Sequence, residues 1–105
     1  MSTGKPAGLQ ITERAFQSQV RQLAATLGWR VYCAWLSIRS PAGYVDLTLC
    51  RDRVIFAELK SESGKLTPAQ ELWFDALRRA GQEVYCWRPS DWEDIVKTLQ
   101  RQIPE

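Results

Sequence analysis

The sequence contains no histidine among its 105 residues. This absence excludes Ser-His-Asp and Cys-His nucleophiles, HExxH zinc sites, and nucleases that rely on a histidine base. Any catalysis must therefore use carboxylates, lysine, hydroxyl groups or a hard metal ion.

Cysteines are few, and their spacing in the sequence shows no pairs. The chain has three cysteines, Cys33, Cys50 and Cys86, each in an apolar segment and none in a CxxC pair. A zinc site or a disulfide framework normally shows paired spacings. We therefore expect reduced thiols buried in the core.

Long apolar runs and strong net charge are also missing. No run approaches the roughly 18 apolar residues of a membrane helix, and the opening "MSTGKPAGLQ" lacks the apolar stretch of a signal peptide. We expect a cytoplasmic protein with no membrane partner. A net charge of +2 neither supports nor excludes nucleic acid, because a local basic patch can suffice.

What the sequence does contain predicts a loose tail over residues 1–10 and a single domain over 11–105. Apolar residues recur at helical spacing after Thr12 and stop at Gly28, which predicts a first helix. A Thr67-Pro68-x-Gln70 capping box and Gly81 bound a second helix, and Ser90 with Glu93 predicts the start of a third. Strands are predicted over residues 29–36, 44–50, 53–59 and 83–88.

The predicted order is α-β-β-β-α-β-α. A helix between the last two strands implies a parallel pair joined by a right-handed crossover, whereas the three earlier strands are expected to be antiparallel neighbours. The fold class is therefore α/β, with a mixed four-stranded sheet flanked by helices.

Three charged residues do not fit the strand pattern of "GYVDLTLCRDRVIFAELK". Side chains alternate between the two faces of a strand. Asp46 therefore lies on the other face from Val45 and Leu47, whereas Glu58 and Lys60 share one face. If the two strands form a hairpin around Arg51 and Asp52, Asp46 and Glu58 become neighbours. Two close carboxylates repel unless a cation lies between them, and oxygen ligands suit Mg²⁺ or Mn²⁺.

Two helical residues are further candidates for this site. Glu13 precedes Phe16 by three positions on the first helix, and Gln70 precedes Trp73 by three on the second. Each residue also has a simpler reading. Asp46 could end a strand, Glu58 and Lys60 could be a solvated pair, Glu13 a first-turn residue and Gln70 only a capping-box member. The joint arrangement favours a site.

These residues resemble a known family. Gly43-x-x-Asp46, Glu58-Leu59-Lys60 and "SGKLTPAQELWFDALRRAG" resemble the VRR-NUC branch of the PD-(D/E)xK nucleases, and the resemblance covers roughly residues 12 to 95. It implies a restriction-endonuclease-like core. Stand-alone members of this branch are small homodimers similar to Holliday-junction resolvases. The loop "SIRSPAGY" does not match the family pattern fully.

The resemblance implies hydrolysis of DNA phosphodiester bonds with Mg²⁺ or Mn²⁺, in a bacterial or phage-infected cell. Asp46, Glu58 and the backbone carbonyl of Leu59 would hold the metal ion. Lys60 would orient or activate water, and Gln70 and Glu13 would support the metal, the water or a phosphate. Branched DNA such as a four-way junction is the expected substrate.

Basic residues around this site are candidates for DNA contact; they are Arg14, Arg39, Arg53 and Lys65, together with Gly64. The Gly64-Lys65 loop could equally be a solvated segment. Trp35 and Trp92 could lie at a subunit interface or in the core. Two other functions remain open: a non-catalytic DNA-binding subunit or adaptor that keeps the nuclease fold, and an interaction protein with no nucleic-acid partner.

Overall fold

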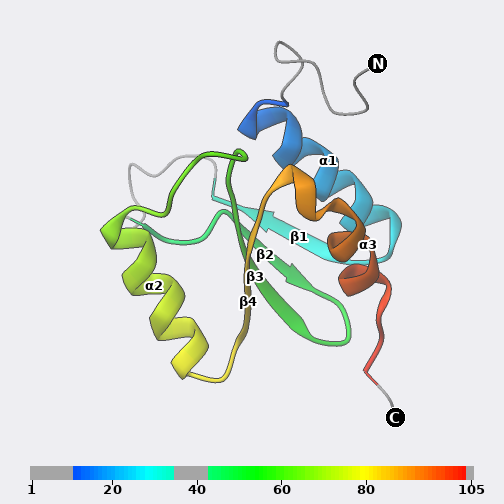
Figure 1. Ribbon diagram of the computed structural model, residues 1–105. Coiled ribbons are helices and arrows are strands. Elements are labelled where there is room, and N and C mark those ends of the chain that lie inside the picture. Colours follow the sequence, from blue (N-terminus) through cyan, green and yellow to red (C-terminus); the bar gives the residue numbers. More distant parts are fainter. Residues whose placement is uncertain (1–10, 35–42, 104–105) are drawn as a thin grey trace.

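The computed structural model describes residues 11–34 and 43–103. The predicted tail and the candidates Trp35 and Arg39 lie outside these ranges. The observed order confirms the prediction (Figure 1); the elements are α1 (Glu13–Thr26), β1 (Arg30–Cys33), β2 (Leu47–Cys50), β3 (Val54–Leu59), α2 (Pro68–Arg79), β4 (Glu83–Trp87), the 3₁₀ turn η2 (Pro89–Asp91) and α3 (Trp92–Gln100).

The four strands form one mixed sheet in the order β1-β2-β3-β4. The β1–β2 and β2–β3 pairs are antiparallel, and β3 pairs in parallel with β4. In the register, Leu47 faces Ala57 and Thr48 faces Phe56. Continuing this register by one residue places Asp46 opposite Glu58, as the sequence predicts.

One face of the sheet carries the core beneath α1 and α3 (Figure 1). The helices contribute Phe16, Val20 and Ala24 from α1 and Ile95 and Leu99 from α3, all fully buried or nearly so. The sheet contributes alternate residues of β2 and β3, namely Leu47, Leu49, Ile55, Ala57 and Leu59. Trp92, a candidate for a subunit interface, packs half-buried against this core.

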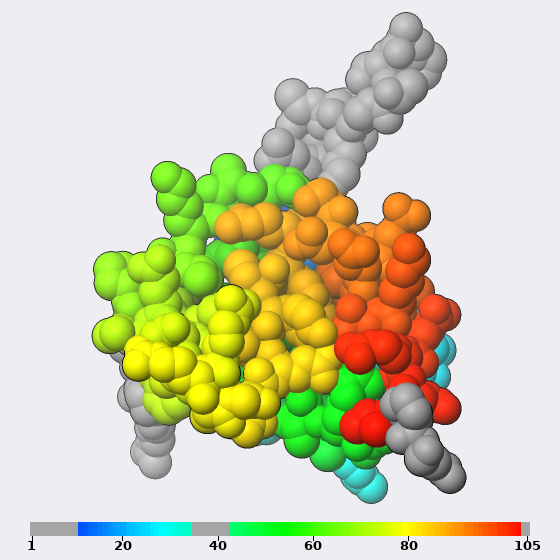
Figure 2. All heavy atoms as spheres, turned by 60° about the horizontal axis from the view of Figure 1, so that its bottom comes forward, coloured from blue at the N-terminus to red at the C-terminus, as the bar shows by residue number. Residues whose placement is uncertain are grey.

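The other face is covered by α2 over only part of its width (Figure 1). Val84 of β4 is buried there, but α2 itself has no buried residue. Tyr32 of β1 is 63% exposed and Leu72 of α2 is 73% exposed. Figure 2 shows α2, β4 and α3 lying side by side across one side of the molecule. In the described part of the chain, no helix is long and apolar enough to cross a membrane.

The helix boundaries follow local capping chemistry, with one exception. Thr12 accepts a hydrogen bond from the N–H of Ala15 at the start of α1, and Thr67 and Gln70 form the predicted capping box of α2. The prediction that Ser90 caps the third helix is wrong. The Asp91 carboxylate instead accepts the N–H of Arg88 at 2.9 Å, which forms η2 and delays α3 to Trp92.

Three further expectations need correction. The turn between β2 and β3 has three residues, 51–53, because Cys50 pairs with Val54. The strand predicted over 44–50 begins only at Leu47. The three cysteines are free but not buried: Cys33 and Cys86 are half-buried at the two edge strands, and Cys50 is exposed on the uncovered face.

Candidate active site

Asp46 and Glu58 meet where β2 begins and β3 ends. Lys60 donates its N–H to the carbonyl of Trp87 at 2.9 Å, so the adjacent Leu59 directs its backbone groups toward the β2 side. There the Leu59 N–H donates to Asp46 Oδ2 at 2.8 Å instead of to a β2 carbonyl. This bond explains why the ladder stops before Asp46. It also leaves Asp46 and the Leu59 backbone facing one another.

Glu58 is held from α2. Its Oε2 accepts a hydrogen bond from Gln70 Nε2 at 2.8 Å, while Gln70 Oε1 accepts the N–H of Thr67 at 2.9 Å. The same amide therefore completes the capping box and orients the carboxylate. Gln70 is thus the capping-box member that the sequence predicts, and its side chain also contacts Glu58.

The Glu58 carboxyl is buried, with the residue only 2% exposed. Its Oε1 atom has no hydrogen-bond partner among the described residues. The pKa of Glu58 is raised to about 8, first by burial and second by the negative charge of Asp46, while the Lys60 charge opposes the rise. Burial likewise raises the pKa of Asp46, against the lowering effect of the Leu59 N–H. The nearby positive charge of Lys60 therefore does not offset the burial of the two carboxyl groups.

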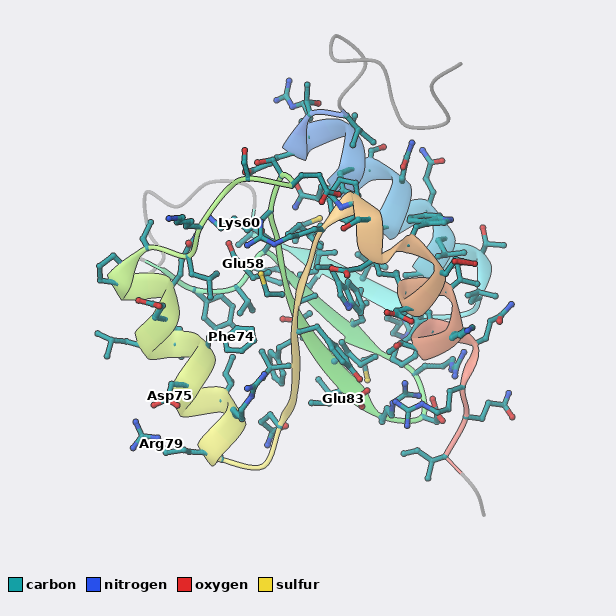
Figure 3. The ribbon with its side chains drawn as sticks, viewed as in Figure 1. Glu58, Lys60, Phe74, Asp75, Arg79 and Glu83 are labelled. Carbon is teal, nitrogen blue, oxygen red and sulfur yellow. The ribbon has the colours of Figure 1, made fainter. Side chains whose placement is uncertain are left out.

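Lys60 follows Glu58 along the same face at the end of β3 (Figure 3). It is half-buried, and its charge lowers the pKa of both carboxyl groups. Glu83, in contrast, marks the opposite end of the sheet in this view. The structure thus brings Asp46, Glu58 and Lys60 together at one end of β3.

Glu13 reaches the site from the first turn of α1. Its Oε2 accepts the N–H of Ser61 at 3.4 Å and lies 3.5 Å from the position that a Cβ on Gly64 would occupy. The same Cβ position lies 3.6 Å from Lys60 Cδ. Gly64 therefore lies between Glu13 and Lys60. Lys65 is exposed beside it.

A cavity of about 280 Å³ opens between α1 and the sheet at this point. It is lined by Glu13, Arg14, Gln17, Asp46 and Leu59. Arg14, a predicted DNA contact, thus lines this cavity beside Asp46. Gln17 was missed, although its position one helical turn after Glu13 is a signal that the sequence contains.

Gly43 fixes the approach of the Asp46 segment to α2. It has a φ of +85°, and a Cβ there would lie 2.4 Å from the Ala69 carbonyl carbon and 2.7 Å from the Gln70 nitrogen. Only glycine fits this close contact. The first residue of the Gly43-x-x-Asp46 motif therefore sets the distance between Asp46 and Gln70.

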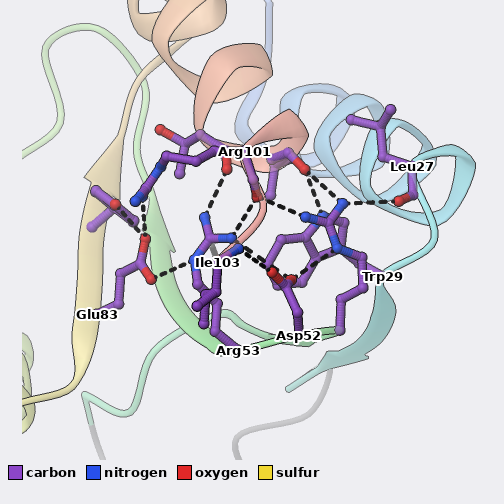
Figure 4. A network of polar contacts seen from close by, with 11 residues as sticks. Leu27, Trp29, Asp52, Arg53, Glu83, Arg101 and Ile103 are labelled. Carbon is purple, nitrogen blue, oxygen red and sulfur yellow. Dashed lines mark hydrogen bonds and ion pairs between the residues drawn. The ribbon is translucent and has the colours of Figure 1, made fainter. Parts of the chain in front are cut away.

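Arg53 is not brought to the site, contrary to its proposed DNA contact. Its guanidinium lies at the opposite end of β3, pairs with Glu83 at 2.7 Å and donates to the carbonyls of Thr98 and Arg101, each at 2.7 Å (Figure 4). Its side chain is only 9% exposed. These contacts occupy the donors that a phosphate would need.

The donor set fits a single hard cation better than a larger cluster. Among the described residues, no group of three or more acidic, cysteine or histidine side chains is arranged to hold a metal ion. Two carboxylates and one backbone carbonyl are, however, enough for Mg²⁺, which keeps several of its waters. The orphaned Glu58 Oε1 and the two raised pKa values indicate where positive charge is missing.

Comparison with known proteins supports this architecture. A solved structure described as "VRR_NUC domain protein" matches with a TM-score of 0.66 at 18% sequence identity, over 87% of this chain and 87% of that chain. This chain has the fold of a VRR_NUC domain. No protein-family model matches the sequence, and no curated protein gives a significant match. The likeness therefore establishes the VRR_NUC fold, and the chemistry must be argued from the residues.

Proposed function

We propose that this VRR_NUC-fold protein is a divalent-metal-dependent DNA endonuclease. The observation that carries the proposal is the buried Glu58 carboxyl, which faces Asp46 with an oxygen that has no partner in the described chain. An isolated pair of buried carboxylates is unfavourable without a counter-charge. Maintaining such a pair beside Lys60 makes sense if a cation binds there during function.

In this proposal Asp46, Glu58 and the Leu59 carbonyl hold Mg²⁺ or Mn²⁺. When bound, the ion supplies positive charge to a phosphate and a water of lowered pKa. Lys60 orients the attacking water or stabilises charge on the phosphate. Gln70 keeps the Glu58 carboxylate directed toward the ion through its 2.8 Å hydrogen bond.

Glu13, Arg14 and the Gly64-Lys65 segment form the surroundings of the phosphate. Arg14 lines the 280 Å³ cavity beside Asp46, so its guanidinium is available to a DNA backbone. Arg53 is left out of this set because its guanidinium is bound at the other end of the sheet.

We further propose that the substrate is branched DNA and that the working form is a homodimer. Resolving a junction requires two cuts, one on each of two strands, and two copies of a small domain supply two sites. The partly uncovered sheet face exposes the apolar side chains of Tyr32 and Val54, and α2 exposes Leu72, so apolar contact area is available to a second copy. Light scattering of the purified protein tests the dimer directly.

The proposed activity is tested with a labelled panel of duplex, single-stranded, flap and four-way-junction DNAs. Each DNA is incubated with EDTA, Mg²⁺ or Mn²⁺ and with wild type or Glu58→Gln. Paired nicks on the junction that require metal and vanish in Glu58→Gln are the expected result. Binding of DNA without any metal-dependent product would instead identify a DNA-binding adaptor with a nuclease fold.

A further inference from the structure

The 61–64 loop, which follows Lys60, is held by Arg88 on the side next to the end of β4. Arg88 lies just after β4, and its Nη1 donates to the carbonyls of Ser61 and Gly64 at 2.5 Å each and of Glu62 at 3.3 Å. One guanidinium nitrogen thus binds three carbonyls of the 61–64 loop. Hydrogen bonds from a charged donor are stronger than neutral ones, so this contact restrains the loop strongly.

Arg88 is itself fixed in place. Its backbone N–H donates to the Asp91 carboxylate at 2.9 Å, which closes the η2 turn. The loop is tied to the same turn a second time, because Glu62 Oε2 accepts the N–H of Ser90 at 2.5 Å. The η2 turn therefore serves as a rigid support for the loop.

The front of this loop faces the candidate site. Ser61 donates its N–H to Glu13 Oε2, and Gly64 packs between Glu13 and the Lys60 side chain. Gly64 also donates its N–H to Ser61 Oγ at 3.0 Å, which closes the loop on itself. A movement of the loop would consequently change the spacing between Glu13 and Lys60.

We propose that Arg88 is a positioning residue for hydrolysis: by fixing the 61–64 loop, its guanidinium sets the placement of Lys60 relative to Glu13. The inference rests on the proposed nuclease function. Arg88 does not act on the metal ligands, since Asp46 and Glu58 are held by Leu59 and Gln70. Its loss should therefore leave metal binding intact and slow the chemical step much more than it weakens DNA binding.

The test compares wild type with Arg88→Ala, Arg88→Lys and the control Arg79→Ala, whose guanidinium pairs with Asp75 on the exposed side of α2. Single-turnover cleavage at saturating Mg²⁺ should fall about tenfold or more in Arg88→Ala, because small misplacements of catalytic groups have large effects on rate. The DNA dissociation constant should rise much less than the rate falls, because Arg14 contacts the phosphate from α1 and does not depend on the loop. Arg79→Ala should match wild type in both.

Rescue of the cleavage rate by added guanidinium ion distinguishes a positioning role of the Arg88 guanidinium from a general effect of Arg88 on folding. Millimolar guanidinium should partly restore the rate of Arg88→Ala and leave Arg79→Ala unchanged. Arg88→Lys should stay slow, because an ammonium group lacks the planar array of donors. Wild-type cleavage by Arg88→Ala, or a parallel loss of DNA affinity and rate, would overturn the inference.

Hydrogen exchange separates failure of this inference from failure of the proposed function. The amides of Ser61 and Gly64 should exchange faster in Arg88→Ala, and this measurement needs no activity. If wild type fails to cleave any DNA, the nuclease proposal fails and the role in hydrolysis fails with it, while faster exchange would still establish that Arg88 holds the loop. Unchanged exchange would overturn the holding role whatever the activity.

Discussion

At the scale of single residues, Glu58 is the one charged side chain that is buried in the described part of the chain. Its environment contains one amide donor, from Gln70, and a second carboxyl group, from Asp46. Burial favours the neutral form of an acid, and a nearby negative charge does so further. The metal-free protein therefore tends to keep a proton on this pair.

This proton predicts how stability depends on pH when no metal is present. The folded pKa of Glu58, about 8, lies above the ordinary value of 4.5 for a glutamate, so between these values the folded state binds more protons than the unfolded state. The stabilisation is fully present below the unfolded pKa and is lost as the pH rises through 8. In EDTA, the free energy of unfolding should thus be smaller at pH 8.5 than at pH 5.5, by an amount on the order of 1 kcal/mol or more.

Urea denaturation of wild type and Glu58→Gln at both pH values checks this prediction. The glutamine keeps an oxygen for the Gln70 amide but does not titrate, so its stability should vary less across this range. An equal decline in both proteins would show that another group is responsible.

Gly43 predicts a difference between two glycine substitutions. Gly43→Ala and Gly81→Ala both place a side chain at positive φ, +85° and +81°, but only Gly43 meets backbone atoms, while nothing lies within 4 Å of a Cβ on Gly81. Gly81→Ala should destabilise the fold by about 1 kcal/mol through backbone strain alone. Gly43→Ala should lose a further ~1–3 kcal/mol through overpacking against α2.

Thermal denaturation measures both losses, and cleavage assays on the folded fraction separate stability from function. Gly43→Ala should also cleave slowly, because it moves the Asp46 segment away from Gln70. Similar stabilities for the two variants would mean that the 2.4 Å approach at Ala69 relaxes without loss.

At the scale of elements, the β2–β3 turn holds the end of α3. Arg51 donates to the carbonyls of Leu27, Leu99 and Arg101, at distances from 2.7 to 3.1 Å (Figure 4). The guanidinium groups of Arg51 and Arg53 lie 4.4 and 5.1 Å from the centre of the Trp29 ring. Carbonyl groups at a helix end have no partners within the helix, and these arginines supply them.

This network predicts that Arg53 contributes to stability and not to DNA binding. Arg53→Ala would remove the donor to the Thr98 carbonyl and one of the three donors to Glu83, which keeps Tyr85 and Arg101, so it should destabilise the protein by about 1–3 kcal/mol. Arg79→Ala removes an exposed pair with Asp75 and should change stability by less than about 0.5 kcal/mol.

Urea denaturation and DNA binding at a temperature where both variants are folded test the prediction. Weaker DNA binding by folded Arg53→Ala, at unchanged stability, would contradict the structural role and restore the role in DNA contact.

The elements also show what the sequence could and could not predict. Periodicity and capping residues predicted the helices and strands, because Thr12 and Thr67 act on amides only three positions away. The Ser90 cap failed because the Asp91 carboxylate closes the earlier η2 turn on the Arg88 N–H, and the Ser90 N–H, which a capping box would give to Glu93, donates to Glu62. Arg53 and Arg88 bind backbone carbonyls, 24 or more positions away in the sequence, and a carbonyl gives no residue-specific signal.

The carboxylate pair was predictable for a related reason. Asp46, Glu58 and Lys60 break an otherwise apolar pattern, and a hairpin register follows from alternation. The contribution of Gly43 was predictable only as part of a motif, since its contact with Ala69 depends on how the second helix packs.

At the scale of the whole molecule, metal binding should couple to stability. A cation that binds the folded carboxylate pair and not the unfolded chain raises the melting temperature by mass action. Because binding displaces the proton on the pair, the rise should be larger at pH 8 than at pH 6. Differential scanning fluorimetry in EDTA, Mg²⁺ and Mn²⁺ measures it, with Glu58→Gln as the variant expected to show little response. A rise in the melting temperature of Glu58→Gln equal to that of wild type would show that the metal binds elsewhere.

The most direct test of the proposed function is the single-turnover rate of DNA cleavage in Mg²⁺ by Asp46→Asn and Asp75→Asn. Both substitutions remove one carboxylate charge, but Asp46 accepts the Leu59 N–H beside Glu58, whereas Asp75 pairs with Arg79 on the exposed side of α2. With both variants folded, Asp46→Asn should lose cleavage by about 10³-fold or more, a loss of roughly 4 kcal/mol of transition-state stabilisation, while Asp75→Asn should cleave like wild type. Equal rates for the two variants would contradict the assignment of this site.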